Sequence, residues 1–435
     1  MLFVCLNPWA LYAKAAAHGA LGQAELARQY ARKWPFFFLR NRLAKYLGRT
    51  QPSLVRELLG SPSSYNSLRT AFELVSGTAL ASMPKPSFTK SNPLLQPLWD
   101  NRSAPFAKDR LASVNALLKA TGGSSVEWAP NGVVQLGFVE HEGGHESSSV
   151  DDLLVTVLVT AFNAGALVKQ SVQSLLNQTH RHLQILVSND ASIDDTWVHL
   201  TALAQLDPRV TVFDLPENIG TYAAKALMLS FAKGEFVVSH DADDLAAPNF
   251  VERSLQTLLR NPRKVAVISN WFRVDEELRI FPGAVRRFWP LLSINHSSLM
   301  VRTAVLKELG GWDVPRVAAD TELFERIRFV YGKRSVVQLP QPLTIGSMRA
   351  DSLMNDPTVG AMDAQAFRLR VEYREAWVDW HQACKKQRIQ PVMPSPLSSE
   401  RPFFVPAAFR VDPSAISRCL AAMQAPQSTP AQALA

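Results

Sequence analysis

The stretch EFVVSHDADD, residues 235–244, decides the fold class, because an apolar run in it passes directly into a cluster of carboxylates. Two other runs also lead into polar residues, because LLVTVLVTAF at 153–162 is followed by Asn163 and LQILVSND at 183–190 ends in Asn189 and Asp190. Helical segments at 166–178 and 195–206 lie between them. Short Val-, Leu- and Ile-rich runs that alternate with helices predict repeated strand–helix–strand units. We therefore expect an α/β fold with a mainly parallel sheet that is covered on both faces.

The C-terminal ends of these strands are where a ligand is expected, because open α/β sheets bind their ligands there. The four strand ends are residues 160–163, 188–190, 215–220 and 240–244. Three of these four are rich in carboxylates or amides.

The HDADD segment predicts a site for a divalent cation. Asp241, Asp243 and Asp244 follow an apolar strand, and unpaired carboxylates this close would raise one another's pKa. A cation removes this conflict, and oxygen ligands suit Mg²⁺ or Mn²⁺, which keep water and substrate phosphate oxygens as further ligands. The alternative is a turn in which Asp244 caps a helix that begins near Pro248.

Two further positions point to a nucleotide. Asp190 lies at a strand exit, where its carboxylate could accept a hydrogen bond from a base-edge N–H, whereas Asp194 and Asp195 are interpreted as helix caps. Gly220 opens a helix, and helix N-termini favour anions. Lys225, one turn further on, either directs positive charge towards the nucleotide or lies on the surface of an amphipathic helix, and the residues alone do not separate these readings.

Asp320 also has two readings. It directly precedes a helix whose apolar face includes Leu323, Phe324 and Ile327. It is therefore either the N-cap of that helix or a general base. Composition and spacing leave the choice open.

Several segments follow one another in an order that resembles the inverting family-2 glycosyltransferases, whose GT-A fold has a Rossmann-type sheet. The resemblance covers residues 153–349, which is under half of the chain. The matching segments are LVTAFNAG, SVQSLLNQT, LVSNDASIDDT, ENIGTYAAKALML, HDADD, SSLMVRTAVLKELGGWD, AADTEL and SMRADSLMND.

The resemblance implies roles for individual residues. It places Asp190 on a uracil-type base, Asp241 on the ribose and the metal, and Asp243 on the metal. It also makes Asp320 the catalytic base. The other positions that it implies in donor binding are Thr160, Phe162, Asn163, Gly220 and Lys225.

This chain departs from the family pattern at two places. Lys225 and Ala226 stand where the family usually has Arg and Asn, and Lys supplies a point charge without a planar fork. Ala319 stands where an acidic residue often precedes the base. His296 is interpreted first as an ordinary polar residue, with a role at the acceptor or metal as the alternative, and Arg349 is assigned to the same side.

The resemblance implies transfer of a sugar from a nucleotide-diphosphate sugar, expected to be a UDP-sugar, to the hydroxyl of a glycan or lipid-linked acceptor. Mn²⁺ or Mg²⁺ is the expected cofactor, and polysaccharide or glycoconjugate synthesis is the expected setting. The sequence has no Q-x-x-R-W motif of the processive members. The alternative is an inactive GT-A scaffold whose basic N-terminal region binds a membrane surface or a protein.

The net charge of +8 lies wholly in the N-terminal region, because residues 1–100 hold 12 Lys+Arg and 4 Asp+Glu. Contact of residues 1–50 with the inner face of a membrane is therefore one hypothesis. No nucleic-acid-binding motif accompanies the charge, so nucleic acid is not an expected partner. The expected parts are a helical, basic N-terminal domain (1–125), a linker (126–152), the GT-A domain (153–350), a helical extension (351–392) and a partly disordered Pro/Ala-rich tail (393–435).

The three cysteines favour a reducing compartment. Cys5, Cys384 and Cys419 are far apart and odd in number, which gives no disulfide framework and no zinc spacing. No stretch of the sequence approaches the ~20 apolar residues that cross a bilayer. We therefore expect a cytoplasmic protein.

Overall fold

A computed structural model of the chain divides into two compact units. It describes residues 44, 52–59, 94–128, 136–138, 152–281, 292–350, 352–361 and 363–425. The first unit comprises Met1–Gly122, Phe272–Ser293 and Met348–Arg368, and the second comprises Gly123–Trp271, Ile294–Ser347 and Leu369–Ala435. Residues 1–50, which carry the membrane hypothesis, lie outside the described residues except for Ala44.

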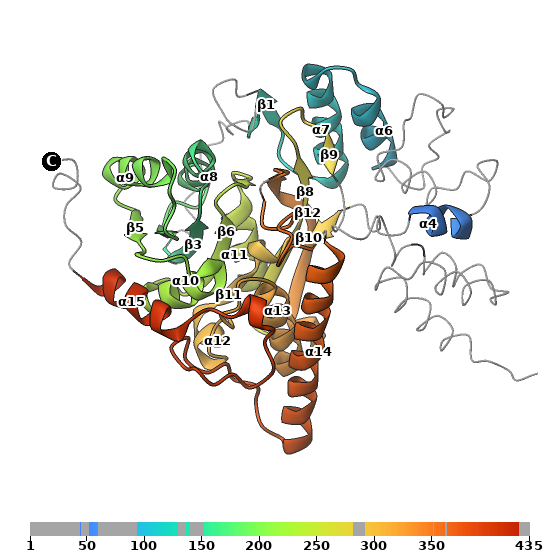
Figure 1. Cartoon of the computed structure of the whole chain (residues 1–435). Helices are drawn as coiled ribbons and strands as arrows, with labels where there is room; N and C mark the ends of the chain where they lie inside the picture. The colour runs from blue at the N-terminus through green and yellow to red at the C-terminus, as the bar shows by residue number, and fades with distance from the viewer. Residues whose placement is uncertain are drawn as a thin grey trace, which may run out of the picture. The chain divides into compact units, whose positions relative to one another are not determined.

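The second unit is built on a sheet whose first half is parallel (Figure 1). Its first four strands stand in the order β5-β4-β3-β6. β3 pairs in parallel with both β4 and β6, and β4 pairs in parallel with β5. This part confirms the strand–helix–strand pattern predicted from the sequence. The bounds are β3 Val155–Ala161, β4 Leu183–Asn189, β5 Val210–Asp214 and β6 Phe236–Asp241.

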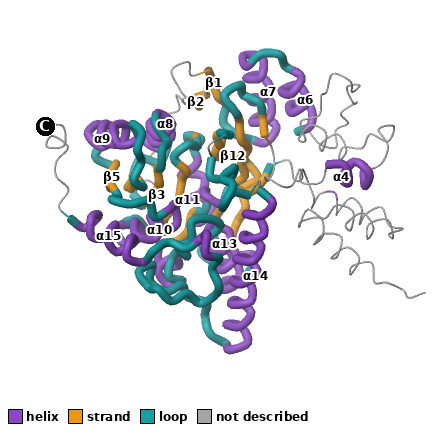
Figure 2. The backbone as a smooth tube through the Cα atoms, in the orientation of Figure 1, coloured by secondary structure: helices purple, strands orange, loops and turns teal. Residues whose placement is uncertain are grey.

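Alternate residues of β3 enter different hydrophobic cores, as the period of two in a strand requires. Val155, Val157 and Val159 belong to one buried cluster, whereas Leu158 belongs to another. Helices α8 and α9 therefore cover one face of the parallel strands and α10 and α15 cover the other (Figure 2). The helices are α8 Ala166–Leu176, α9 Thr196–Leu206, α10 Gly220–Met228 and α15 Pro413–Gln424.

The second half of the sheet contains antiparallel pairs, which the apolar runs did not indicate. β11 runs antiparallel to both β6 and β8, and β12 runs antiparallel to β7. An apolar run predicts a strand but not its direction, because direction depends on the connection between strands. The bounds are β7 Leu245–Ala246, β8 Ala266–Val274, β10 Ser293–Ile294, β11 Met300–Arg302 and β12 Val336–Ser347.

Two regions outside the expected domain core are ordered. Within the expected linker, β1 (Val126–Trp128) and β2 (Leu136–Phe138) form an antiparallel pair. Within the expected tail, α15 is capped by Asp412, which accepts a hydrogen bond from the Ser414 amide, and its residue Ile416 is buried in a core cluster. The tail assignment therefore missed a helix, because its Pro- and Ala-rich composition hid an apolar face. The remaining elements of this part are η3 Leu229–Phe231, α11 Phe250–Leu259, η4 His296–Ser298, α12 Thr303–Glu308, α13 Ala319–Tyr331, η5 Lys333–Ser335, α14 Ala364–Gln387 and η6 Ala407–Phe409.

The first unit is helical where the structure describes the N-terminal region, as expected. It contains α4 (Pro52–Leu59), α6 (Leu95–Ser103) and α7 (Ala107–Thr121), together with the short strand β9 (Ile280–Phe281). The buried Asn101 side chain donates to the Leu278 carbonyl at 2.9 Å and accepts from the Ile280 amide at 2.8 Å. These bonds attach α6 to the β9 segment.

Across the described parts of both units, no helix is long and apolar enough to span a membrane.

Candidate active site

The end of β6 carries a carboxylate that is paired on both oxygens. The Ser297 hydroxyl donates to Asp241 Oδ2 at 2.6 Å, and Lys225 Nζ lies 3.5 Å from Asp241 Oδ1. The side chain of Asp241 is 36% exposed, so it can still meet a ligand. Burial raises the pKa of Asp241, but the Lys225 ammonium and the Ser297 hydroxyl outweigh it and hold the pKa below its usual value. Asp241 is therefore ionised at neutral pH.

Lys225 is not a surface residue. Its side chain is only 3% exposed, and it pairs with the carboxylate at the end of β6. This burial excludes the surface reading that the sequence left open, whereas a contact of Lys225 with the nucleotide stays a prediction. A buried ammonium needs such a partner, because removing it from water is costly.

Asp243 follows two residues later and accepts a hydrogen bond from the Ser347 hydroxyl at 3.1 Å. No group of three or more His, Cys, Asp or Glu side chains is arranged to hold a metal ion in the described part of the chain. Mg²⁺ and Mn²⁺ often use only one or two carboxylates and complete their shell with water and substrate phosphates. The half-buried pair Asp241 and Asp243 fits that limited donor set. The helix α11 begins at Phe250 with Asn249 before it, so Asp244 is not its cap.

Asp190, after β4, is held by the start of α10. Its Oδ1 accepts from the Ile219 amide and its Oδ2 accepts from the Gly220 amide, both at 2.8 Å. Burial raises the pKa of Asp190 to about 6, although these amides and the charge of Arg316 favour the ionised form. We expected the N-terminus of α10 to receive an anion of the ligand. The structure instead gives those amides to a carboxylate of the protein itself.

Gly220 is needed at this point for its backbone. Its φ is +77°, a left-handed conformation that side chains rarely adopt, and an added Cβ would lie 3.5 Å from Arg316 Cα. Arg316 in turn donates to the Asn218 side chain at 2.9 Å. The glycine therefore lets its amide approach Asp190.

The loop after β3 is joined to the loop after β4. The Asn163 amide donates to Ser192 Oγ, and Asn163 Oδ1 accepts from the Ile193 amide, both at 2.9 Å. Thr160 Oγ1 lies 2.6 Å from Thr221 Oγ1 of α10. Phe162 is 50% exposed. Thr160 in β3 and Asn163 in the loop after it thus lie beside the elements that hold Asp190.

Asp320 lies in the first turn of α13 but is not its N-cap. The residue before the helix is Ala318, with φ of 71°, and no side chain caps the helix there. Asp320 Oδ1 accepts from the Thr321 amide at 2.7 Å. Burial and the charge of Asp320 raise the pKa of the Tyr222 hydroxyl, which is in α10, well above its usual value.

The helix α10 therefore connects the predicted carboxylates. Its first amides bind Asp190, Lys225 pairs with Asp241, and the charge of Asp320 acts on Tyr222. Asp243 lies two residues beyond Asp241.

The two remaining candidates are placed differently. The ring of His296 packs edge-on against Phe324 of α13, with centroids 5.4 Å apart. This contact accounts for His296 as a packing residue near Asp320, and its acceptor or metal role stays a prediction. Arg349 belongs to the first compact unit, so its acceptor role also stays a prediction.

Sequence reasoning missed Ser297 and Ser347, which donate to predicted carboxylates, and Tyr222, on whose hydroxyl the charge of Asp320 acts. Serine is too common in a sequence for a single one to indicate a site unless the carboxylate to which it donates is known. Tyr222 carried a usable signal, because it lies three residues before Lys225 and therefore on the same face of a helix.

Comparison with known proteins identifies the family of the core region. Residues 156–304 match the family model described as "Glycosyl transferase family 2". The resemblance predicted from the motifs is thereby confirmed for this part of the chain, and so is the expected GT-A type of α/β fold with helices before it.

Curated relatives match over short stretches. An uncharacterized glycosyltransferase of Haemophilus influenzae is 34% identical over 114 residues, which is 26% of this chain and 35% of the relative. The E. coli UDP-Glc:alpha-D-GlcNAc-diphosphoundecaprenol beta-1,3-glucosyltransferase WfgD is 30% identical over 112 residues, which is 26% of this chain and 44% of the relative. The chain thus spans less than half the length of these relatives.

Solved structures with related folds include S. aureus TarS 1-349 in complex with UDP-GlcNAc, which is 16% identical with a TM-score of 0.36 over 46% of this chain and 60% of that chain. The mannosyltransferase PcManGT from Pyrobaculum calidifontis, in complex with GDP-Man and Mn2+, is 20% identical with a TM-score of 0.37 over 67% of this chain and 82% of that chain.

Proposed function

We propose that this chain is an inverting, metal-assisted glycosyltransferase that moves a sugar from a UDP-sugar to an acceptor hydroxyl. The observation that carries the proposal is the arrangement around α10, which binds Asp190 through its first amides and pairs with Asp241 through Lys225. The charge of Asp320 also acts on Tyr222 of this helix. Donor and acceptor have to meet in one oriented place for transfer.

The donor side of the proposed site is built from the ends of β3, β4 and β6. Asp190 would accept a hydrogen bond from the base, since each carboxylate oxygen has a second lone pair beside the one used by an α10 amide. Asp241 would bind the ribose. The other residues proposed to bind the nucleotide sugar are Thr160, Phe162, Asn163, Gly220 and Lys225.

The metal ion would be Mn²⁺ or Mg²⁺, held by Asp243 with help from Asp241. When bound, such an ion offsets the negative charge that develops on the leaving diphosphate. Lys225 adds a fixed positive charge beside Asp241, where it orients that carboxylate.

Asp320 would act as the general base. It would take the proton of the acceptor hydroxyl while the acceptor oxygen forms a bond to the anomeric carbon. The bond from that carbon to the diphosphate breaks on the opposite face, and its electron pair leaves with the nucleoside diphosphate. One displacement inverts the anomeric centre, so an α-linked donor gives a β-linked product.

Asp320→Asn tests the proposal. General-base assistance contributes about 10²–10⁴-fold, so transfer should fall by at least about 100-fold while donor affinity stays within about twofold. The matched control is Glu325→Gln on the same helix, whose carboxylate pairs with Arg328 at the surface at 2.6 Å. The measurements are product formation from a panel of UDP-sugars with Mn²⁺ and calorimetric donor binding.

Preserved transfer with lost donor binding would contradict the role of Asp320. A wild-type chain that neither transfers sugar nor hydrolyses any donor would favour the inactive scaffold instead.

The proposed acceptor is a glycan or lipid-linked sugar in polysaccharide or glycoconjugate synthesis, in the cytoplasm or at the inner face of the membrane. The name of the E. coli relative, which acts on a diphosphoundecaprenol-linked sugar, supports this choice. Co-sedimentation with anionic liposomes, comparing the full chain with a chain that lacks residues 1–50, tests the membrane contact. Equal sedimentation of the two would exclude residues 1–50 as the contact.

A further inference from the structure

Arg316 is a charged residue to which the proposed mechanism assigns nothing. It lies in the loop between Trp312 and α13, four residues before Asp320. Its Nη1 donates to Asn218 Oδ1 at 2.9 Å. Among the ion pairs of the described residues, none joins the Arg316 guanidinium to a carboxylate, so no such pair offsets its positive charge.

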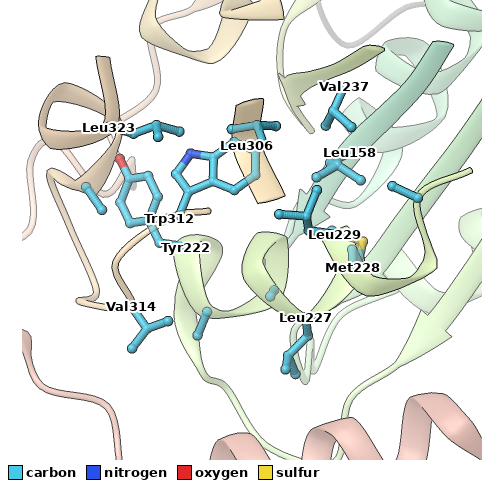
Figure 3. Packing of buried hydrophobic residues seen from close by; sticks show 14 of the residues in the cluster. Leu158, Tyr222, Leu227, Met228, Leu229, Val237, Leu306, Trp312, Val314 and Leu323 are labelled. Atoms are coloured by element: carbon cyan, nitrogen blue, oxygen red, sulfur yellow. The ribbon is translucent and has the colours of Figure 1, made fainter. Parts of the chain in front are cut away.

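The loop that carries Arg316 is fixed by packing and by a backbone hydrogen bond. Trp312 and Val314, which come just before Arg316, are buried. Figure 3 shows both in the apolar cluster that also contains Tyr222 of α10. The Arg316 amide donates to the Phe409 carbonyl at 2.8 Å. The backbone at Arg316 is therefore held in one place beside α10.

Asn218 connects Arg316 to the donor-base end of the site. Its Oδ1 accepts from Arg316, and its Nδ2 donates to the Asp190 backbone carbonyl at 3.1 Å. The next two residues, Ile219 and Gly220, donate their amides to the Asp190 carboxylate. A Cβ at Gly220 would lie 3.5 Å from Arg316 Cα, so Arg316 also packs against this turn. Arg316 thus fixes the residue from which both carboxylate-binding amides follow.

Several segments packed around Asp190 carry charged or titratable groups. These groups are Arg316, Asp214, Glu217, Arg418 and Cys419. Asp214 accepts from the Asn189 side chain at 2.6 Å, and Glu217 accepts from Arg418 at 2.9 Å, so both carboxylates have partners. Burial raises the pKa of the Cys419 thiol, which is therefore neutral at pH 7. The charge of Arg316 favours ionised Asp190, against the burial that raises the pKa of this carboxyl to about 6.

Resting on the proposed function, we propose that Arg316 is a positioning residue for recognition of the donor base. Its guanidinium holds Asn218 against Asp190 and supplies a positive charge that favours the carboxylate form, which can accept the base-edge N–H of a uracil. Arg316 also joins this end of the site to the helix that carries Asp320. A purely structural arginine would only stabilise its loop, and its removal would lower donor affinity equally at every pH.

Arg316→Met in the full chain separates these roles, because it removes the charge and the hydrogen bond to Asn218. The probes are UDP-glucose and UDP-N-acetylglucosamine, whose diphosphate diesters do not titrate near neutral pH. Without the charge, the pKa of Asp190 should rise, so that the carboxyl takes up its proton at a higher pH than in the wild type. Calorimetry with Mg²⁺ should show donor affinity lowered about tenfold at about pH 6 but less than about threefold at about pH 8.

Three further variants make the test specific. Arg316→Lys keeps the charge, so the pH midpoint of donor affinity should stay at the wild-type value. Arg418→Met is the matched control, because it removes an exposed arginine that pairs with Glu217, and it should not move the midpoint. In an Asp190→Asn background, Arg316→Met should cause no pH-dependent loss of donor affinity.

An unmoved midpoint in Arg316→Met would overturn the proposal, as would an equal shift in Arg418→Met. A pH-dependent loss that persists in the Asp190→Asn background would also overturn it. A wild-type chain that binds no UDP-sugar at any pH would defeat the proposed function itself, which is a different result.

Discussion

Two buried ionic groups of the second unit differ in how far solvent reaches them. The first, here called the structural cluster, consists of Glu322, Arg326 and His381, and the second, here called the site pair, consists of Lys225 and Asp241. Arg326 and Glu322 are fully buried, with 3.0 Å between Nε and Oε1, and His381 Nε2 lies 3.1 Å from the same Oε1. The site pair is longer, at 3.5 Å, and its carboxylate is 36% exposed.

The remaining bonds of Arg326 show what the structural cluster does. Its guanidinium donates to the carbonyls of Leu309 and Gly311, both at 2.5 Å. It therefore fixes the GGWD loop to α13 and leaves nothing for a ligand. The difference teaches that a buried charge does not by itself indicate a ligand-binding site. A carboxylate that is ionised and still partly exposed to solvent does indicate one.

The largest expected effect is on the structural cluster. Arg326→Met leaves Glu322 buried without its main partner, which should cost about 3–5 kcal/mol of folding free energy. Activity per folded molecule should be kept. Urea unfolding measures the loss, and Arg328→Met, which removes an exposed pair with Glu325, is the control and should cost under about 1 kcal/mol. Equal unfolding free energies of the two variants would show that the structural cluster stabilises the fold no more than the surface pair does.

The next effect concerns pH. The folded pKa of Asp190 is about 6, above its unfolded value, so the folded state holds this proton more tightly. The resulting stability is fully present below about pH 4 and is lost as pH rises through 6, by about 3 kcal/mol. Asp190→Asn should therefore flatten the difference in unfolding free energy between pH 4 and pH 7. If the variant showed the same difference in unfolding free energy between pH 4 and pH 7 as the wild type, the pKa of Asp190 in the folded state would not be near 6.

A smaller effect is expected at the site pair. Lys225→Met should weaken donor binding about tenfold, or ~1.4 kcal/mol, with less loss of stability than Arg326→Met because water can reach Asp241. Calorimetric donor affinity and the melting temperature are the measurements, and the exposed Lys233→Met is the control. A large drop in melting temperature with donor affinity intact would place Lys225 with the structural cluster.

The smallest effect compares two neighbouring hydroxyls. Ser297 donates to Asp241 at 2.6 Å, whereas Ser298 accepts from the Ser269 amide at 2.9 Å and is buried. Ser297→Ala should raise donor KM about fivefold, or ~1 kcal/mol, without a change in stability. Ser298→Ala should lower stability by about 1 kcal/mol and leave donor KM unchanged. The reverse pattern would contradict the assignment of Ser297 to the site.

The local sequence pattern predicted the parallel strands and their polar ends, because each strand and its end consist of consecutive residues. HDADD and SNDASIDD stand directly after their strands, and the structure keeps them there. The antiparallel direction of β11 and the burial of α15 were not predictable in the same way. Both depend on the elements that pack beside β11 and α15, and the composition of a segment does not indicate which elements these are.

The same distinction between local sequence pattern and tertiary packing applies to the residues of the site. By itself, the sequence determined which carboxylates follow β4 and β6 and which one opens α13, since each position is local. Only the tertiary structure decided that Lys225 is buried, that the α10 amides bind Asp190, and that Ser347 donates to Asp243. The last of these bonds joins residues 104 positions apart, and such a bond forms only when the fold brings distant segments together.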